Sequence, residues 1–418
     1  MKRREFLRYL ASVSATTAAA ALTNPLRPRL SFAQTANGKT LVVVFQRGGC
    51  DGVNTVIPYG DPEYTQLRPG IAIAPPNGAN PNSAIDLDGF LGLHPALRPL
   101  QTIWDDGNLA VLPAVQYPNA TRSHFDGQQN IESAADATDL DGWLNRHLVT
   151  LPRPASLRAV GLESALPHSL RGSEIVSSFR DIGSFNLGLS AAEDQALLTE
   201  LNRVYSQQPD SSKAYRDLVT GFGRVLVNDL AVLSSIDPDS YVVENGAAYP
   251  NSTFGRQMRQ VAQLIKQGLG LEVAALGIGG WDTHSSQGGP FGRQASRHAD
   301  FAAGIAALYT DLGATRRDDV VILTMTEFGR TAAENASGGT DHGHASAWFA
   351  AGGAVNGGIH GAWPGLATNQ LVRGRYLDHS VDFRDVLAEV AANHLGNTSI
   401  DTVVPNYTPQ PLGMIAAG

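Results

Sequence analysis

The feature that most constrains the fold is a series of short, strongly apolar runs separated by stretches with helical character. The first run, residues 39–46 (KTLVVVFQ), is rich in β-branched residues and leads directly into Arg47-Gly48-Gly49. Similar runs follow at residues 109–112, 271–276, 320–323 and 347–351. Nearly continuous apolar runs of this length are typical of strands buried on both faces of a parallel sheet. The chain is therefore predicted to be an α/β protein with a wound, mostly parallel sheet.

The stretches between these runs predict helices on both faces of the sheet. Apolar residues recur at helical spacing in residues 94–104, 297–312 and 383–395. Residues 165–268 are more polar and contain no strong strand signal, with helices expected at 191–205 and 215–233. This segment is expected to form a helical insertion or cap. Residues 34–418 are long enough for one large α/β domain with such an insertion, or for two small domains.

The N-terminus has the features of an export signal. Residues 2–8 (KRREFLR) contain paired arginines, residues 9–22 are weakly apolar, and Ser31-Phe32-Ala33 offers a small-x-small cleavage site. These features predict a twin-arginine signal peptide at residues 1–33, cut after Ala33, with the twin-arginine translocase as an export partner. The mature protein would then be periplasmic or secreted. An ordinary amphipathic N-terminal helix is the alternative.

Composition excludes several classes of function. Loss of residues 1–33 removes six basic residues and one acidic residue, which changes the formal net charge from −8 to −13. Such an acidic chain has no footprint for nucleic acid, and no later segment is apolar enough for a stable membrane span. The single cysteine, Cys50, excludes an intramolecular disulfide and a four-thiolate metal site. Any metal must therefore be held by His, Asp or Glu.

Four segments that follow predicted strands carry candidate functional residues, because reactive groups in open parallel sheets collect at the carboxyl ends of strands. In the first, residues 48–54, flanking glycines let the chain turn sharply at Asp51. Asp51 is either a metal ligand or a turn residue that caps backbone amides. In the second, residues 121–126, Ser123 is a candidate nucleophile between Arg122 and His124, although such surface pairs are often incidental.

The other two segments are dense in metal-ligand residue types. Asp282 and His284 lie two residues apart, so in an extended segment both side chains point to one side and could bind one cation. Asp341, His342 and His344 follow the run at 320–323, and a hydrogen-bonded loop pair is the alternative for the first two. Glu327 and Arg330 form either a structural ion pair, a helix cap or a support for metal ligands.

These segments, in this order, resemble the bacterial domain-of-unknown-function family 1501, which is similar to the alkaline phosphatase and sulfatase superfamily. The matching segments are residues 48–52, 123–125, 282–284, 327–331 and 339–343. The resemblance implies an alkaline phosphatase-like fold and one divalent ion, zinc, manganese or calcium, shared by Asp51, Asp341 and His342, with Ser123 as nucleophile. It also implies a second ion, held by Asp282, His284 and a last histidine, for which the sequence offers His344, His360 and His379.

Three departures from the superfamily pattern bear on activity. The spacing between Asp282 and His284 is shorter than usual, and no terminal histidine stands out, which weakens the second metal site. Cys50 lacks the Cys-x-Pro-x-Arg context from which sulfatases make formylglycine, which argues against a conventional sulfatase.

The function predicted from these residues is metal-dependent hydrolysis of small-molecule or envelope phosphate or sulfate esters outside the cytoplasm. Ser123 would attack, Arg122 would bind the anion, and His124 would complete the catalytic set. One alternative is an exported scaffold or binding protein that keeps the fold without turnover. Another, a metal-free serine hydrolase, lacks the Gly-x-Ser-x-Gly elbow.

Overall fold

The computed structural model describes residues 38–135, 141–153, 155, 157–184, 191–206 and 214–416. The predicted signal segment, residues 1–33, lies outside these residues, so the division into a signal and one domain stays a prediction. In the described part of the chain, the main sheet has nine strands in the order β11-β5-β10-β9-β1-β8-β6-β7, with β12 beside β5. Their bounds are β1 (Thr40–Arg47), β5 (Leu109–Gln116), β6 (Ala159–Gly161), β7 (Ser177–Ser178), β8 (Val273–Gly279), β9 (Val320–Met325), β10 (Ser346–Ala351), β11 (Gly358–Ile359) and β12 (Val381–Asp382).

The sheet is mostly parallel, as predicted. β1 runs parallel to β8 and β9, β6 runs parallel to β7 and β8, and β11 and β12 run parallel to β5. β10 is the exception, because it is antiparallel to both β5 and β9. Residues 326–345, which join β9 to β10, contain no helix, so the chain turns back without the crossover that a parallel strand requires. The carboxyl ends of β1, β5, β8 and β9 therefore meet at one edge, beside the start of β10.

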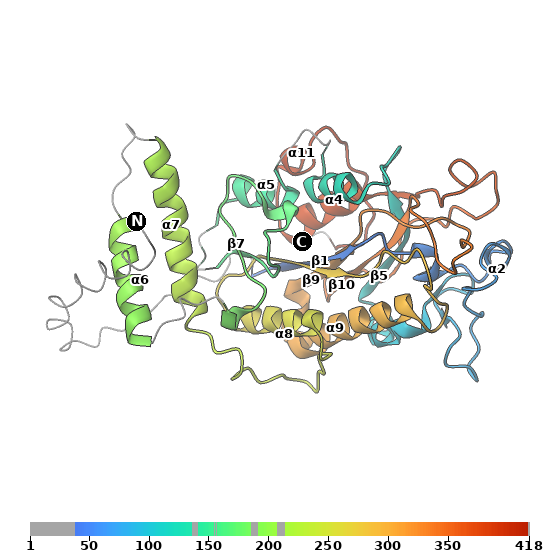
Figure 1. Ribbon diagram of the computed structural model, residues 1–418, viewed down its shortest axis with the longest axis horizontal. Helices are drawn as coiled ribbons and strands as arrows, with labels where there is room; N and C mark the ends of the chain where they lie inside the picture. Colours follow the sequence, from blue (N-terminus) through green and yellow to red (C-terminus); the bar gives the residue numbers. More distant parts are fainter. Residues whose placement is uncertain are drawn as a thin grey trace.

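Helices cover both faces of the sheet, which confirms the predicted layers (Figure 1). Side chains alternate along β1, with Val42 and Val44 on one face and Leu41, Val43 and Phe45 on the other. The first face packs against α8 (Thr253–Lys266), α9 (Arg293–Arg316), η2 (Pro95–Leu100) and α3 (Gln101–Asp105). The second packs against α4 (His124–Ser133), α5 (Trp143–Thr150), α10 (Phe383–Glu389), η6 (Val390–His394) and α11 (Ile400–Val403).

One predicted helix differs in type. Residues 94–104 form the 3₁₀ helix η2 followed by the short α-helix α3. Pro95 and Pro99 lie in η2, and Pro99 inside the turn removes an amide donor that a regular α-helix would use. The apolar spacing was therefore correct, but the prolines change the helix type.

The loops at the carboxyl edge have a small core of their own. A three-stranded sheet of β2 (Val56–Ile57), β4 (Gly92–Leu93) and β3 (Ile85–Asp86) lies there with α2 (Tyr64–Leu67). Short 3₁₀ turns complete the described elements: η1 (Gly52–Asn54), η3 (His168–Leu170), η4 (Ile182–Ser184) and η5 (Arg317–Asp319). Buried residues of these loops pack with Ala332 and Ala345, which belong to the segment between β9 and β10.

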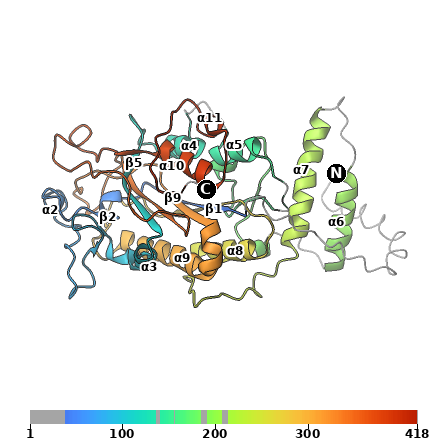
Figure 2. The ribbon, with the colours of Figure 1, turned by 180° about the vertical axis from the view of Figure 1, so that it is seen from behind.

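Two helices project from one end of the sheet, in the segment where a helical insertion was expected, and the last residues of the second, Val232 and Leu233, pack in the core of the sheet. α6 (Ala191–Tyr205) and α7 (Ala214–Leu233) lie side by side at one end of the molecule, seen in both Figure 1 and Figure 2. They share a small cluster of Leu198, Val227 and Leu230. α8 belongs to the same stretch of sequence but packs on the sheet. Among the helices that the structure describes, none has the length and apolar character needed to cross a membrane.

Candidate metal centre

Arg330 ties together the loops at the carboxyl edge. Its side chain is buried, and it donates hydrogen bonds to the backbone oxygens of Gly49 at 2.6 Å, Trp281 at 3.1 Å and Thr340 at 3.2 Å. It also forms an ion pair with Asp282, with 2.6 Å between Nη2 and Oδ1. One guanidinium thus fixes the loops after β1, β8 and β9 relative to one another and holds the carboxylate of Asp282 in place.

Three histidines gather around Asp282. Its Oδ1 atom lies 3.0 Å from Nε2 of His284 and 3.4 Å from Nε2 of His342. Its Oδ2 atom lies 3.6 Å from Nε2 of His124. The Nε2 atoms of His284 and His342 are 3.0 Å apart. We call these four residues the Asp282 cluster.

Each ring of the cluster is oriented by an oxygen at its other nitrogen. The Nδ1 atom lies 2.8 Å from Oε1 of Glu327 in His124, 2.9 Å from the backbone oxygen of Arg122 in His342, and 3.0 Å from Oδ1 of Asp341 in His284. An acceptor at Nδ1 favours the tautomer with the proton on that nitrogen. The Nε2 lone pairs are then directed at the common centre, which is the arrangement that oriented metal-binding histidines have.

The donor set fits a divalent cation. Nε2 of His124 is buried without a hydrogen-bond partner in the described part of the chain. Donor atoms of His124, Asp282 and His342 all lie within 4.8 Å of one another. Two imidazole nitrogens bound tetrahedrally to zinc at about 2.0–2.1 Å would be separated by roughly 3.3–3.4 Å, close to the His284–His342 separation. His124, Asp282 and His342 thus have the chemistry and the spacing of a metal site, and His284 lies beside two of them.

The pKa shifts within the cluster indicate the charges of its members. The hydrogen bond with Glu327 raises the pKa of His124. Burial alone would raise the pKa of both carboxyls, but the hydrogen bond from His124 lowers that of Glu327, and Arg330 lowers that of Asp282. Burial lowers the pKa of His342. At neutral pH, therefore, both carboxylates are ionised and His342 is neutral, as a metal ligand must be.

A second group of ligand-type residues lies nearby. Nε2 of His344 is 3.4 Å from Nδ1 of His379 and 3.9 Å from Oδ1 of Asp378, and that oxygen is 3.0 Å from Nδ1 of His379. Burial, followed by the charge of His379, lowers the pKa of His344 to about 4. His344 is two residues from His342, so the two groups are neighbours. We call this set the His344 group.

Asp51 has a different environment from the one expected. Its carboxylate is buried and paired with both terminal nitrogens of Arg68, at 2.6 Å and 2.9 Å, and it accepts a hydrogen bond from Gln287 at 2.6 Å. Asp51 belongs to neither group of ligand-type residues. The structure therefore does not bring Asp51 together with Asp341 and His342 as the shared metal set that the resemblance implied.

Asp341 also differs from its expected place. Its Oδ1 atom accepts from His284 and, at 3.1 Å, from Asn335, while Oδ2 lies 3.6 Å from Arg375. The hydrogen bond with His284 lowers the pKa of Asp341. Asp341 thus orients a histidine of the cluster, whereas His342, its neighbour, is a member of it.

The three catalytic candidates of residues 121–126 have different surroundings in the structure. Ser123 is the N-cap of α4, and its Oγ atom accepts from the amide of Asp126 at 3.5 Å. Among the described residues, its hydroxyl forms no hydrogen bond with a histidine of the cluster. Arg122 contributes its carbonyl to His342, and its guanidinium lies 4.7 Å from the ring centre of Tyr376. His124, the third candidate, is a member of the Asp282 cluster.

Two further residues differ from what the sequence indicated: one candidate ligand lies outside both groups, and one member of the His344 group was not among the candidates. His360 has both ring nitrogens opposite backbone oxygens, those of Leu412 at 3.2 Å and Asn356 at 2.9 Å, and is in neither group. Asp378 was missed, although the adjacent Asp378-His379 repeats the Asp-His pairing of residues 341–342 and could have drawn attention to it.

The chain was compared with solved structures, curated proteins and family models. The lipoteichoic acid synthase LtaP from Listeria monocytogenes is a solved structure with 9% identity and a TM-score of 0.38, over 87% of this chain and 73% of its own. The comparison with curated proteins gives no match. The family model described as "Protein of unknown function (DUF1501)" matches residues 112–406, a stretch that contains both ligand groups. The chain therefore belongs to the DUF1501 family, which confirms the family identified from its sequence motifs.

Proposed function

We propose that this protein is an exported, metal-dependent hydrolase of phosphate or sulfate esters. The observation that supports the proposal best is the Asp282 cluster, in which three oriented imidazoles and one carboxylate converge. A nitrogen-rich set of this kind favours zinc over calcium, because calcium prefers six to eight oxygen ligands. The His344 group supports a second ion close to the first.

The chemistry follows from what each residue can hold. A divalent ion bound in the Asp282 cluster would neutralise charge on the transferred group and lower the pKa of a bound hydroxyl or water. Glu327 and Asp341 keep His124 and His284 in the ligand tautomer. The guanidinium of Arg122 forms no hydrogen bond or ion pair with the residues that the structure describes, so it is free to bind an oxygen of the ester.

Ser123 is the proposed nucleophile. It stands at the N-terminus of α4, where unpaired backbone amides favour a developing negative charge. Its Oγ would form a bond to phosphorus or sulfur while the bond to the leaving oxygen breaks. The Oγ proton passes to solvent, the leaving alkoxide takes a proton from solvent, and water then releases the acid and restores Ser123.

The test is hydrolysis by the mature protein after zinc loading. 4-Nitrophenyl phosphate, bis(4-nitrophenyl) phosphate and 4-nitrophenyl sulfate cover the proposed ester classes. His342→Ala should abolish turnover, whereas His360→Ala, a histidine outside both groups, should leave it within about twofold. If wild-type and His342→Ala give equal rates with every ester, the proposal fails.

Ser123→Ala separates a covalent route from direct attack by water. Through a covalent intermediate, the wild-type protein would transfer phosphate to an added alcohol as well as to water. The variant should lose both reactions while keeping its metal. If Ser123→Ala hydrolyses the esters at the wild-type rate, a metal-activated water replaces Ser123 in the proposal.

A binding protein without turnover is the second candidate, and one observation favours it. The Ser123 hydroxyl is already engaged as the cap of α4, a purely structural use. Metal bound at the cluster together with no turnover in the ester screen would support this candidate.

Export is proposed on the sequence of residues 1–33. Arg3→Lys with Arg4→Lys should leave uncut precursor in the cytoplasm, as judged by fractionation and mass. A double variant that is still cut and exported would contradict this part of the proposal.

A further inference from the structure

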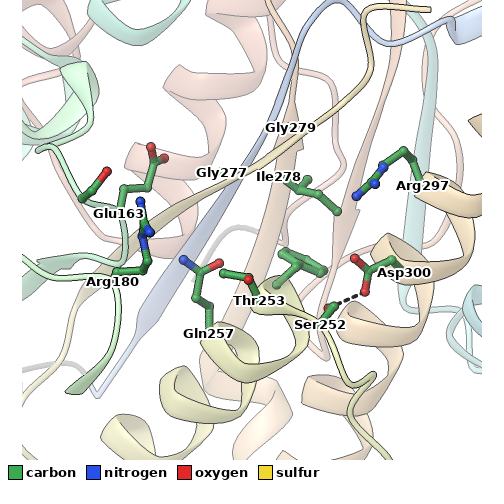
Figure 3. A pocket seen from close by; sticks show the side chains of 12 residues that line it. Glu163, Arg180, Ser252, Thr253, Gln257, Gly277, Ile278, Gly279, Arg297 and Asp300 are labelled. Atoms are coloured by element: carbon green, nitrogen blue, oxygen red, sulfur yellow. Dashed lines mark hydrogen bonds between the residues drawn. The ribbon is translucent and has the colours of Figure 1, made fainter. Parts of the chain in front are cut away.

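A cavity of about 390 Å³ opens beside the carboxyl end of β8, outside the two ligand groups. Its wall is formed by residues 277–279 of β8, the start of α8, one face of α9 and the loops after β6 and β7 (Figure 3). The volume lies in the range that binds small molecules. None of the residues proposed for hydrolysis lines it, so its contents need a separate explanation.

Two arginines stand at opposite sides of this cavity, Arg180 and Arg297 (Figure 3). Neither guanidinium forms a hydrogen bond or ion pair with the residues that the structure describes. The carboxylates that line the cavity have other partners. Glu163 is paired with Arg47 at 3.1 Å, and Asp300 accepts from Oγ of Ser252 at 2.6 Å. The cavity thus holds two guanidiniums that lack a bonded carboxylate in a chain that is acidic overall.

The start of α8 adds the positive end of a helix dipole to a wall that carries two arginines and the carboxylates of Glu163 and Asp300. Thr253 and Phe254, the first residues of α8, line the cavity, and the first turn contains no acidic residue. Ser252 caps the helix by accepting from the amide of Gly255 at 2.9 Å. First-turn amides have no acceptor within their own helix and carry the positive end of its dipole. Two arginines and a helix N-terminus that face one hollow are the usual surroundings of a bound oxyanion.

The cavity adjoins the Asp282 cluster. Gly279 lines the cavity, and Asp282 follows it by three residues, a distance of at most about 10 Å along the chain. Arg297 packs against the intervening loop, since a Cβ atom added at Gly280 would lie 3.0 Å from its Nε. The cavity and the Asp282 cluster therefore lie at the two ends of one short loop.

We propose that this cavity binds an oxyanion, a phosphate or carboxylate group, through Arg180 and Arg297. That this group belongs to the substrate rests on the proposed function. On that basis, the substrate is an organic ester with two separated negative charges, one at the cluster and one in the cavity. Arg180 and Arg297 are then the residues that select for the second charge.

Titration of the full mature protein with inorganic phosphate, after metal removal with EDTA, tests the site itself. Calorimetry should give saturable binding by the wild-type protein. The variant with Arg180→Gln and Arg297→Gln should bind at least about tenfold more weakly, because it loses two charge-assisted contacts. The matched control has Arg98→Gln and Arg293→Gln, two exposed arginines that do not line the cavity, and should stay within about twofold. No saturable binding, or equal weakening in both variants, would overturn the proposal.

Hydrolysis of a matched pair of esters tests the link to substrate. Relative to phenyl phosphate, 4-carboxyphenyl phosphate adds one negative charge on the side away from the ester. The arginine variant should raise KM for 4-carboxyphenyl phosphate about tenfold with kcat unchanged, and should leave phenyl phosphate within about twofold. Equal KM changes for both esters would refute selection by the cavity. If neither ester is hydrolysed, the proposed function fails, while the phosphate titration still decides whether the cavity binds an oxyanion.

Discussion

Two aspartates of this protein end similar segments, each of the form Gly-Gly-x-Asp, and have opposite environments. Asp51 ends the segment Gly48-Gly49-Cys50-Asp51 after β1, and Asp282 ends the segment 279–282 (GGWD) after the neighbouring parallel strand β8. The side chain of Asp51 is fully buried against Arg68, whereas that of Asp282 is 47% exposed among three histidines. In the register of the two strands, Arg47 lies opposite Gly279, so the two segments are offset by one residue.

The difference shows that a carboxylate after a parallel strand does not by itself define a metal ligand. A buried carboxylate that is paired with both terminal nitrogens of a guanidinium is already neutralised and needs no cation. Asp282 also meets an arginine, Arg330, but the Nε2 atoms of three imidazoles lie around it as well, and these atoms could bind a shared cation. The partners that the fold supplies therefore decide whether the carboxylate is fully enclosed by one guanidinium or stays half-exposed among histidines.

The largest expected effect concerns the stability of the two sites. Asp51→Asn leaves the guanidinium of Arg68 buried without its counter-charge and should lower the free energy of unfolding by about 3–5 kcal/mol. Asp282→Asn also removes the counter-charge of a buried guanidinium, that of Arg330, but its carboxylate is half-exposed and screened by water, so the loss should be smaller, about 1–2 kcal/mol. Urea unfolding of the metal-free variants measures both. Equal losses would mean that the two aspartates do not differ in the way that their environments indicate.

Metal affinity should show the reverse order. Asp282→Ala or His342→Ala removes one proposed ligand of four. Losing about a quarter of the binding free energy of a typical structural zinc site corresponds to roughly 100-fold weaker zinc binding. Asp51→Asn, measured under conditions where it is folded, should bind zinc within about twofold of wild-type, as should His360→Ala. Competition with a chromophoric chelator gives these affinities. Loss of zinc in the folded Asp51→Asn protein would restore the metal set that the sequence implied.

The orienting carboxylates come next in magnitude. Glu327→Gln keeps a side chain of the same size but weakens the acceptor at Nδ1 of His124, and should cost about 10–100-fold in zinc affinity. Glu334→Gln is the matched control, because Glu334 accepts from the amides of Gly70 and Ile71 away from the histidines. An unchanged affinity in Glu327→Gln would show that His124 is not a ligand.

The smallest effect is a shift in pH dependence. Protons compete with the metal for Nε2 of His124, and the hydrogen bond with Glu327 raises the pKa of this histidine. Zinc affinity should therefore fall as the pH drops, beginning at the elevated pKa of His124. Glu327→Gln removes the hydrogen bond that raises the pKa of His124. The pH at which zinc affinity begins to fall should therefore be lower in this variant than in the wild-type protein. Affinities measured between about pH 5 and 8 would reveal the shift, and coincident limbs for both proteins would contradict it.

Much of the fold could be predicted from the sequence because it depends on local patterns. The apolar runs at 39–46 and 320–323 became β1 and β9, and the expected helix at 191–205 has the bounds of α6. The antiparallel direction of β10 has no local signature, because it depends on how residues 326–345 turn back. The apolar spacing of residues 94–104 predicts a helix, but only the prolines indicate that much of it is a 3₁₀ helix.

The candidate site was harder to predict because it depends on long-range partners. Strand ends correctly brought Asp282, His284 and His342 to one place, but nothing in the sequence pairs Arg68 with Asp51. The adjacency of Asp341 and His342 suggested that both bind one ion. In the structure, Asp341 instead accepts a hydrogen bond from Nδ1 of His284, while Nε2 of His342 faces the centre of the cluster.

The most direct test of the account is a crystal structure of the mature protein soaked with zinc, with anomalous data collected at the zinc edge. A peak is expected within about 2.0–2.2 Å of an oxygen of Asp282 and of the Nε2 atoms of His124 and His342, with His284 at the same centre. Asp51 should remain paired with Arg68. A peak coordinated by Asp51, or no peak at the Asp282 cluster at saturating zinc, would contradict the account.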